Sequence, residues 1–186
     1  QMASLPLDPR LSRMLLKDVR LGSLEEVAII AGALSIQDPR LRPLEKAADA
    51  DRLQSVFEHS ESDFLTLVNI WRAMKTMGQD PVDTPSLKKF AHDYFLSYNR
   101  LREWSFIHDQ ILEILAEQKI KPASDKTLLT ESDRYAAIHQ SILSGFISHL
   151  AVQKEKNIYQ AARHQEAMLW PGSAPTRSAC CCLITP

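Results

Sequence analysis

Basic and aromatic side chains gather between residues 88 and 104, and they are the residues of this chain best suited to bind a polyanion. Lys88, Lys89, Asn99, Arg100 and Arg102 supply ammonium, amide and guanidinium groups. Aromatic side chains are interleaved with them, namely Tyr94, Phe95, Tyr98 and Trp104. Such groups bind the phosphates of a nucleic-acid strand, and aromatic rings support or stack on its bases. An amphipathic helix with a solvated polar face has the same spacing, so both interpretations stay open.

The sequence contains none of the common motifs for nucleotide binding, metal binding or nucleophilic catalysis. The chain has five glycines and contains neither a G-x-x-x-x-G-K-[ST] phosphate loop nor a G-x-G-x-x-G turn. It also lacks H-E-x-x-H and G-x-S-x-G. Among six scattered histidines, His108 and His139 fall beside apolar positions, where we expect core or surface imidazoles rather than ligands or bases. We therefore predict no catalytic residue, no metal site and no cofactor for this chain.

The three cysteines are adjacent, at Cys180, Cys181 and Cys182. Adjacent cysteines lack the C-x-x-C spacing of a zinc site, and three of them do not make a disulfide framework. The absence of cysteine from the preceding 179 residues fits a reducing compartment. We read the triplet as part of an unstructured tail, with metal binding or lipidation as the alternatives.

Length and charge limit the class of protein. A chain of 186 residues forms one ordinary domain or two small ones. Its net charge is −1, whereas a free-standing nucleic-acid binder usually carries a basic excess. Binding to nucleic acid would then use a local patch or neighbouring domains. No apolar run approaches the roughly 20 residues of a membrane span, and no signal peptide is visible. Since the first residue is Gln1, we expect a piece of a longer protein.

Helical periodicity covers most of the chain up to residue 146. The predicted helices begin near Asp8, Ser23, Pro43, Ser62 or Asp63, Ser86, Ser97 and Thr130. Asp8 can cap a helix with Pro9 in its first turn. Ser23 with Glu26 has the spacing of a capping box, and Thr130 with Asp133 resembles one more capped helix start. The basic and aromatic residues are thus placed on two consecutive helices.

The four residues DPRL occur twice, at Asp8–Leu11 and at Asp38–Leu41. Their flanking sequences differ, so they do not mark an internal repeat. Aspartate can accept hydrogen bonds from the backbone that follows it, and proline fixes φ. We therefore predict that both are turn devices, with Arg10 and Arg40 in packing or domain contacts rather than in a binding site.

The pattern changes after Gly145. Apolar residues 146–152 are followed by a polar stretch, 154–157, which we read as a turn. Two short segments, 158–162 and 167–170, have the length of strands, and Pro171-Gly172 stops the second. Two or three strands form only an incomplete sheet.

Five segments resemble, in order, the C-terminal region of DEAH-box RNA helicases of the bacterial HrpA type. They are LPLDPRLSRMLL, EVAIIAGALSIQDPRLRP, SDFLTLVNIWRAM, FLSYNRLREW and YAAIHQSILSGFISHLAV, and with their spacings the likeness covers most of residues 4–172. Trp170-Pro171-Gly172-Ser173 is similar to the family's F-x-x-P-G-S. The likeness stops after Ser173, where we expect a truncation, a frameshift or a degraded gene copy.

The resemblance implies a mainly α fold, with a helical bundle followed by an incomplete OB-like β segment. Its implied divisions are the end of a winged-helix domain (1–21), a helical ratchet or helicase-associated domain (22–146), the first strands of an OB-fold (147–173) and a disordered tail (174–186). Two or three strands leave an unpaired edge, so a closed barrel is not expected.

The resemblance also implies a function. The chain would be an accessory fragment of a cytoplasmic, ATP-dependent RNA helicase, holding single-stranded RNA against RecA-like motor domains that it lacks. ATP and Mg2+ belong to those motor domains, and the chain alone should be inactive. Asn99, Arg100 and Arg102, in the segment resembling F-L-x-Y-R-x-x-R-E-W, are the first candidates for RNA contacts, followed by Lys88 and Lys89. The alternative is a helical protein-interaction module without a nucleic-acid role.

Overall fold

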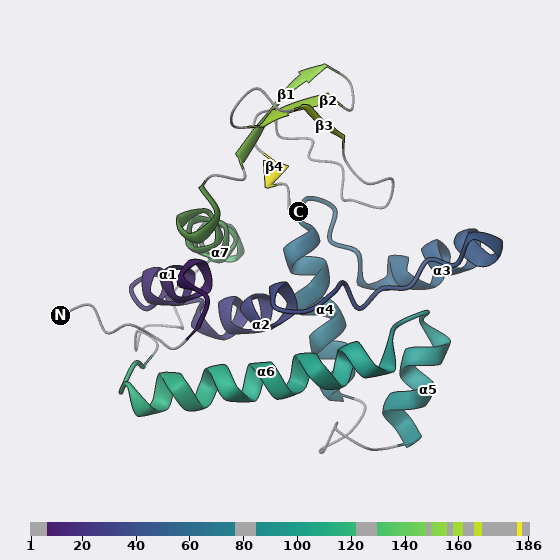
Figure 1. The fold of residues 1–186 in the computed structure, drawn as a ribbon, viewed down its shortest axis with the longest axis horizontal. Helices are drawn as coiled ribbons and strands as arrows, with labels where there is room; N and C mark the ends of the chain where they lie inside the picture. Colours follow the sequence, from purple (N-terminus) through teal and green to yellow (C-terminus); the bar gives the residue numbers. More distant parts are fainter. Residues whose placement is uncertain are drawn as a thin grey trace. The chain divides into compact units, whose positions relative to one another are not determined.

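The computed structural model describes residues 7–76, 85–121, 130–147, 150–155, 158–161, 166–168 and 182–183. Helices dominate, and short antiparallel strands follow them, which confirms the predicted fold class (Figure 1). Several expected features lie outside the described residues: Gly78, the linker 79–84, Pro122, His149, His164, the Trp170–Ser173 motif and two of the cysteines, Cys180 and Cys181. No described helix has the length and apolar character that a bilayer crossing requires.

The chain divides into two compact units. The first contains residues 1–24, 60–62 and 122–186, and the second contains residues 25–59 and 63–121. Helix α7 therefore belongs with α1 and the strands, although the sequence placed it in one domain with the other helices. The OB-fold and the four predicted divisions of the chain stay predictions.

The first unit is built on a pair of helices. Its elements are α1 (Pro9–Asp18), α7 (Glu131–Phe146), β1 (Leu150–Glu155), β2 (Ile158–Ala161), β3 (Glu166–Met168) and β4 (Cys182–Leu183). The helices touch closely at Gly145, because a Cβ there would lie 2.4 Å from the backbone oxygen of Arg10. The buried Ser141 hydroxyl donates to Asp18 Oδ1 at 2.9 Å, and the Arg10 guanidinium lies 5.3 Å from the centre of the Phe146 ring.

The strands form one antiparallel sheet in the order β3-β2-β1-β4. Lys154 and Glu155 lie in β1, so their interpretation as a turn was wrong. A register shift between Gln153 and Glu155 accommodates them against β2. Cys182–Leu183 pairs with the first two residues of β1, within the range expected to form a tail.

The second unit is a bundle around the long helix α6. Its elements are α2 (Leu24–Leu34, in this unit from Glu25), the 3-10 turns η1 (Leu44–Lys46) and η2 (Ser55–Phe57), α3 (Ala47–Gln54), α4 (Asp63–Thr76), α5 (Pro85–Asp93) and α6 (Tyr98–Glu117). Trp104 of α6 is completely buried. Its indole lies 5.1 Å from that of Trp71 in α4 and donates to the carbonyl oxygen of Ile29 in α2 at 2.9 Å.

Local capping signals mark the starts of α1 and α7. Asp8 accepts from the Arg10 amide with Pro9 at the first helical position, and Thr130 and Asp133 form a capping box at the predicted helix start. The capping box at Ser23 was wrong, since its buried hydroxyl oxygen has no hydrogen-bond partner among the described residues. Glu26 instead accepts from Arg72 Nη2 at 2.9 Å, because tertiary packing brings that guanidinium within reach.

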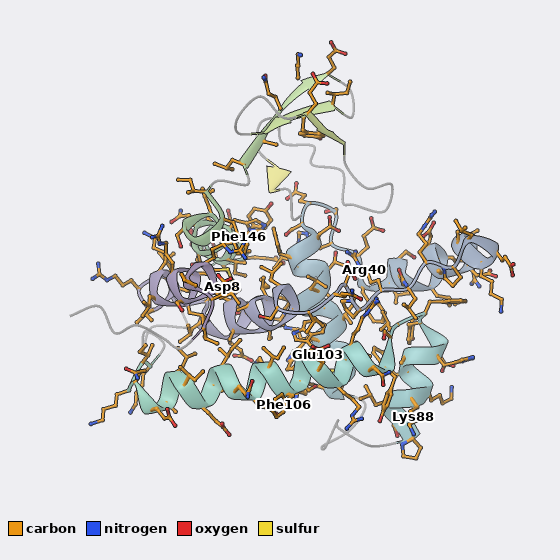
Figure 2. All side chains as sticks on the ribbon, viewed as in Figure 1. Asp8, Arg40, Lys88, Glu103, Phe106 and Phe146 are labelled. Carbon is orange, nitrogen blue, oxygen red and sulfur yellow. The ribbon has the colours of Figure 1, made fainter. Side chains whose placement is uncertain are left out.

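Both DPRL segments form the same local device, as predicted. Asp8 accepts from the backbone amide of Arg10 at 2.8 Å and from its guanidinium at 3.1–3.2 Å. Asp38 accepts from the Arg40 amide at 2.8 Å and from its guanidinium at 2.6–3.1 Å. Figure 2 labels Asp8 and Arg40 in their separate units. Arg40 also reaches Asp63 Oδ1 at 3.5 Å, so the second device joins the loop to α4.

His108 gives the second unit a pH-dependent stability. Its ring is buried 4.4 Å from the Trp71 ring, and burial lowers its pKa although Asp109, 3.5 Å away, opposes the shift. The unfolded chain therefore binds this proton more readily than the folded chain does. The contribution of neutral His108 to the free energy of unfolding is fully present above the unfolded histidine pKa of about 6.5. It decreases as the pH falls below that value.

Urea unfolding at pH about 7.5 and about 5.5 checks this expectation, because the free energy of unfolding should be lower at the acidic pH. His108→Gln should reduce the difference between the two pH values. His92→Gln, at a side chain that is 91% exposed, serves as the control and should preserve it. Equal pH dependence in the wild type and in His108→Gln would contradict the role given to His108.

Candidate nucleic-acid interface

A tight turn between α5 and α6 positions the candidate site. Phe95 adopts a left-handed φ of 51°, and Leu96 next to it pairs with Arg40 in an isolated bridge. Ser97 then caps α6, its hydroxyl oxygen accepting from the Arg100 amide at 3.5 Å. The turn folds the two helices against each other, so residues of α5 and the first turns of α6 share one corner of the unit.

Two cations converge on one aromatic ring at this corner. Lys88 Nζ lies 5.4 Å from the centre of the Tyr98 ring, and Arg102 Cζ lies 5.7 Å from it. We call Lys88, Tyr98 and Arg102 the basic corner. Figure 2 shows Lys88 on α5 and, farther along α6, Glu103 and Phe106. Among the described residues, neither cation forms an ion pair with a carboxylate of the chain.

Arg102 differs from the other arginines of the second unit. Its Nε is buried and has no hydrogen-bond partner within the described part of the chain. Every other arginine of the unit donates to an acceptor or forms an ion pair: Arg40, Arg42, Arg52, Arg72 and Arg100. A buried donor without an acceptor is costly, so Arg102 is the least satisfied arginine of this unit.

The remaining three predicted site residues are placed differently. Lys89 pairs with Asp93 one turn along α5. Arg100 donates to the carbonyl oxygen of Asp38 at 2.8 Å and to Gln37 Oε1 at 2.6 Å, and so it fastens the loop before Arg40. Asn99 is exposed on the first turn of α6. The structure therefore brings Lys88 and Arg102 together and engages Lys89 and Arg100 within the chain.

Tyr98 is the residue that sequence reasoning left out of the site. The sequence showed it only as one of several interleaved aromatic residues. In the structure, the turn between α5 and α6 places its ring next to a cation from each helix. The spacing of Tyr98 and Arg102, four residues apart on a helix, could have indicated one of the two contacts. The contact with Lys88 depends on the packing of α5 against α6.

The electrostatics of α6 favour an anion at this corner. The N-terminal end of a helix carries a partial positive charge, which acidic residues in the first turn usually offset. The first turn of α6 contains no acidic residue, and Arg102 adds a positive charge just beyond it. Two cations beside a helix N-terminus are together suited to a phosphate group. Among the described residues, no group of three or more histidine, cysteine or acidic side chains could hold a metal ion.

Comparisons with known proteins point to one family. Residues 8–67 match the model of a protein family described as "Helicase associated domain (HA2), ratchet-like". The chain is 37% identical over 174 residues to the "ATP-dependent RNA helicase HrpA homolog" of Haemophilus influenzae and 36% identical over 174 residues to "ATP-dependent RNA helicase HrpA" of Escherichia coli. Each alignment covers 93% of this chain. The resemblance drawn from the sequence motifs is thereby confirmed.

A more distant relative comes from an animal. The chain is 28% identical over 151 residues to a "Probable ATP-dependent RNA helicase DHX35 homolog" of Caenorhabditis elegans, an alignment that covers 81% of this chain. The chain spans 13% of the length of each of the two HrpA proteins and 19% of the length of this third relative. The similarity therefore concerns one region of much longer proteins.

Proposed function

Because the chain corresponds to the C-terminal region of DEAH-box, HrpA-type RNA helicases, we propose that it is an accessory region that holds single-stranded RNA through its basic corner. The observation that carries the proposal is the convergence of Lys88 and Arg102 on the Tyr98 ring, where neither cation has a carboxylate partner among the described residues. A phosphate of the RNA backbone would pair with the positive charges of Arg102 and Lys88. Contacts of this kind position a strand without reading its sequence.

The basic corner would act together with parts that this chain does not contain. RecA-like motor domains would bind ATP and Mg2+ and move the strand, and the corner would hold the strand against them. A cytoplasmic location belongs to the same proposal. Of the residues first considered, Lys88 and Arg102 would contact RNA and Asn99 would lie beside them. Lys89 and Arg100 would support the corner through Asp93 and the Gln37–Asp38 loop.

The test is binding of a fluorescently labelled oligouridylate by the 186-residue chain, followed by anisotropy from about 50 to 200 mM salt. Replacing both Lys88 and Arg102 by alanine should weaken binding about tenfold at low salt. It should also reduce the slope of log affinity against log salt by about 1.4, since each phosphate neutralised on a single strand contributes about 0.7. Arg102→Lys should keep most of the slope but bind less tightly, because an ammonium group makes no bidentate contact.

A matched control removes the same charge elsewhere in the second unit. Lys46 and Lys121 are exposed and form no ion pair among the described residues, so replacing both by alanine leaves the corner intact. This control should retain the wild-type slope. An unchanged slope in the Lys88/Arg102 variant, or an equal loss in the control, would contradict the proposal. Complete absence of RNA binding by the wild-type chain at low salt would favour the protein-interaction alternative.

A further inference from the structure

Gln54, the last residue of α3, fastens the turn that carries the basic corner. Its side-chain Nε2 lies 3.0 Å from the carbonyl oxygen of Leu41, 3.3 Å from that of Tyr94 and 2.9 Å from that of Phe95. All three neighbouring atoms are acceptors, so the amide must turn its NH2 group toward them and not its oxygen. The side chain therefore joins three segments that are separate in sequence: the end of α3, the loop at Leu41 and the turn between α5 and α6.

The turn at Phe95 depends on such contacts because its backbone is strained. A φ of 51° is costly for a bulky residue, and a conformation of this kind persists only where the surrounding structure holds it. Two donors meet at the Phe95 carbonyl oxygen, the Gln54 side chain at 2.9 Å and the Leu41 amide at 2.8 Å. Two residues later, the Ser97 amide donates to the Pro39 carbonyl oxygen at 2.8 Å. Of these three contacts, only the one from Gln54 can be removed by changing a side chain.

This turn sets the geometry of the basic corner. Lys88 lies on α5 before the turn, whereas Tyr98 and Arg102 lie on α6 after it. The Lys88 ammonium is 5.4 Å from the centre of the Tyr98 ring, close to the limit of about 6 Å for such contacts, so a small opening of the turn would end the contact. Backbone strain is often found at ligand-binding sites, where it keeps groups pre-organised. A strained turn between the two cations therefore indicates a site whose geometry is held in advance.

We propose that Gln54 is a positioning residue for RNA binding, an inference that rests on the function proposed for the basic corner. Its amide holds the left-handed turn closed, so that Lys88 and Arg102 converge on the Tyr98 ring before RNA arrives. A phosphate then meets two cations that are already in place, and binding does not have to order them. Loss of the Gln54 amide keeps every charge of the chain but lets the two cations separate.

The first test examines the corner without RNA, through the NMR chemical shift of the Lys88 ε-methylene protons. The Tyr98 ring moves this shift upfield, and Tyr98→Leu gives the value without the ring. Gln54→Met keeps the length of the side chain and removes its donors, and it should reduce the upfield shift to less than about half of the wild-type effect. Asn69→Leu is the matched control, because Asn69 Nδ2 also donates to a backbone carbonyl oxygen of this unit, that of Phe57 at 3.0 Å. The control should keep the wild-type shift.

The second test measures binding of the labelled oligouridylate to the 186-residue chain at about 50 mM salt. Gln54→Met should bind about fivefold more weakly than the wild type and than Asn69→Leu, as expected for the loss of one hydrogen-bonding side chain. In a chain that already lacks the side chains of Lys88 and Arg102, Gln54→Met should have no further effect. Circular dichroism verifies that each variant is folded. Gln54→Asn, which keeps the amide on a shorter side chain, should change both measurements in the same direction and replaces Gln54→Met if that variant does not fold.

Three results separate the role of Gln54 from the function of the corner. An unchanged Lys88 shift, or equal RNA affinity of Gln54→Met and Asn69→Leu, would overturn the role of Gln54, while RNA binding by the wild type would still support the proposed function. A further loss of affinity when Gln54→Met is added to the Lys88/Arg102 variant would also overturn that role, because Gln54 would then act outside the corner. Failure of the wild-type chain to bind oligouridylate would overturn the proposed function and the RNA role of Gln54 together.

Discussion

Replacing Trp104 by alanine is expected to lower the free energy of unfolding of the second unit by about 3–5 kcal/mol. Its side chain is completely buried and connects three helices of the unit. It packs on Trp71 of α4, donates to the Ile29 carbonyl oxygen of α2, and faces Gly32, where a Cβ would lie 2.9 Å from the indole Cδ1. Alanine would leave a large cavity and remove the indole donor to the Ile29 carbonyl oxygen.

Urea unfolding followed by circular dichroism measures this loss. Trp104→Phe is the intermediate variant, because it keeps an aromatic ring but removes the donor to Ile29 and part of the buried volume, with an expected cost of about 1–3 kcal/mol. Phe106→Ala is the control on the same helix, since the Phe106 side chain is mostly exposed and should change stability little. Similar destabilisation by Trp104→Ala and Phe106→Ala would show that α6 is not anchored through the indole.

The second large effect is expected at Gly145, where alanine should destabilise the first unit by about 1–3 kcal/mol. Alanine ordinarily stabilises a helix interior relative to glycine by about 0.5–1 kcal/mol. Here the added Cβ would lie 2.4 Å from the Arg10 carbonyl oxygen and 3.2 Å from its carbonyl carbon. Those atoms belong to the backbone of α1, so relief requires the two helices to move apart.

Ala136→Gly provides the reference for this measurement, because Ala136 is exposed on the same helix and reports helix propensity alone. Ala136→Gly should cost about 1 kcal/mol, which means that alanine is the better residue at that position. At position 145 the order should be reversed, so that glycine gives the higher free energy of unfolding and alanine the lower. A Gly145→Ala variant that is more stable than the wild type in thermal or urea unfolding would show that α1 and α7 can separate without loss.

Local sequence signals predicted the helices better than they predicted the site. The Asp8 and Thr130 caps form as expected because a cap uses atoms within three residues of each other. The predicted Ser23 capping box does not form, because the Ser23 hydroxyl has no partner among the described residues, and Glu26 accepts from Arg72, which is 46 residues away in sequence. The strand that includes Lys154 and Glu155 was misread because its polar residues resemble a turn, whereas pairing with β2 holds them extended.

The sequence by itself determined the mainly helical fold, the family resemblance, the two Asp-Pro-Arg turn devices and the segment in which the candidate site lies. These depend on periodicity, caps and short motifs, which are local. Only the tertiary structure decided which cations are available. Arg100 is held by Gln37 and Arg102 is not, and the two differ by two positions in one helix. Whether a cation is available to bind a ligand depends on hydrogen-bond acceptors from distant parts of the chain. A local sequence pattern does not show which acceptors will lie near it.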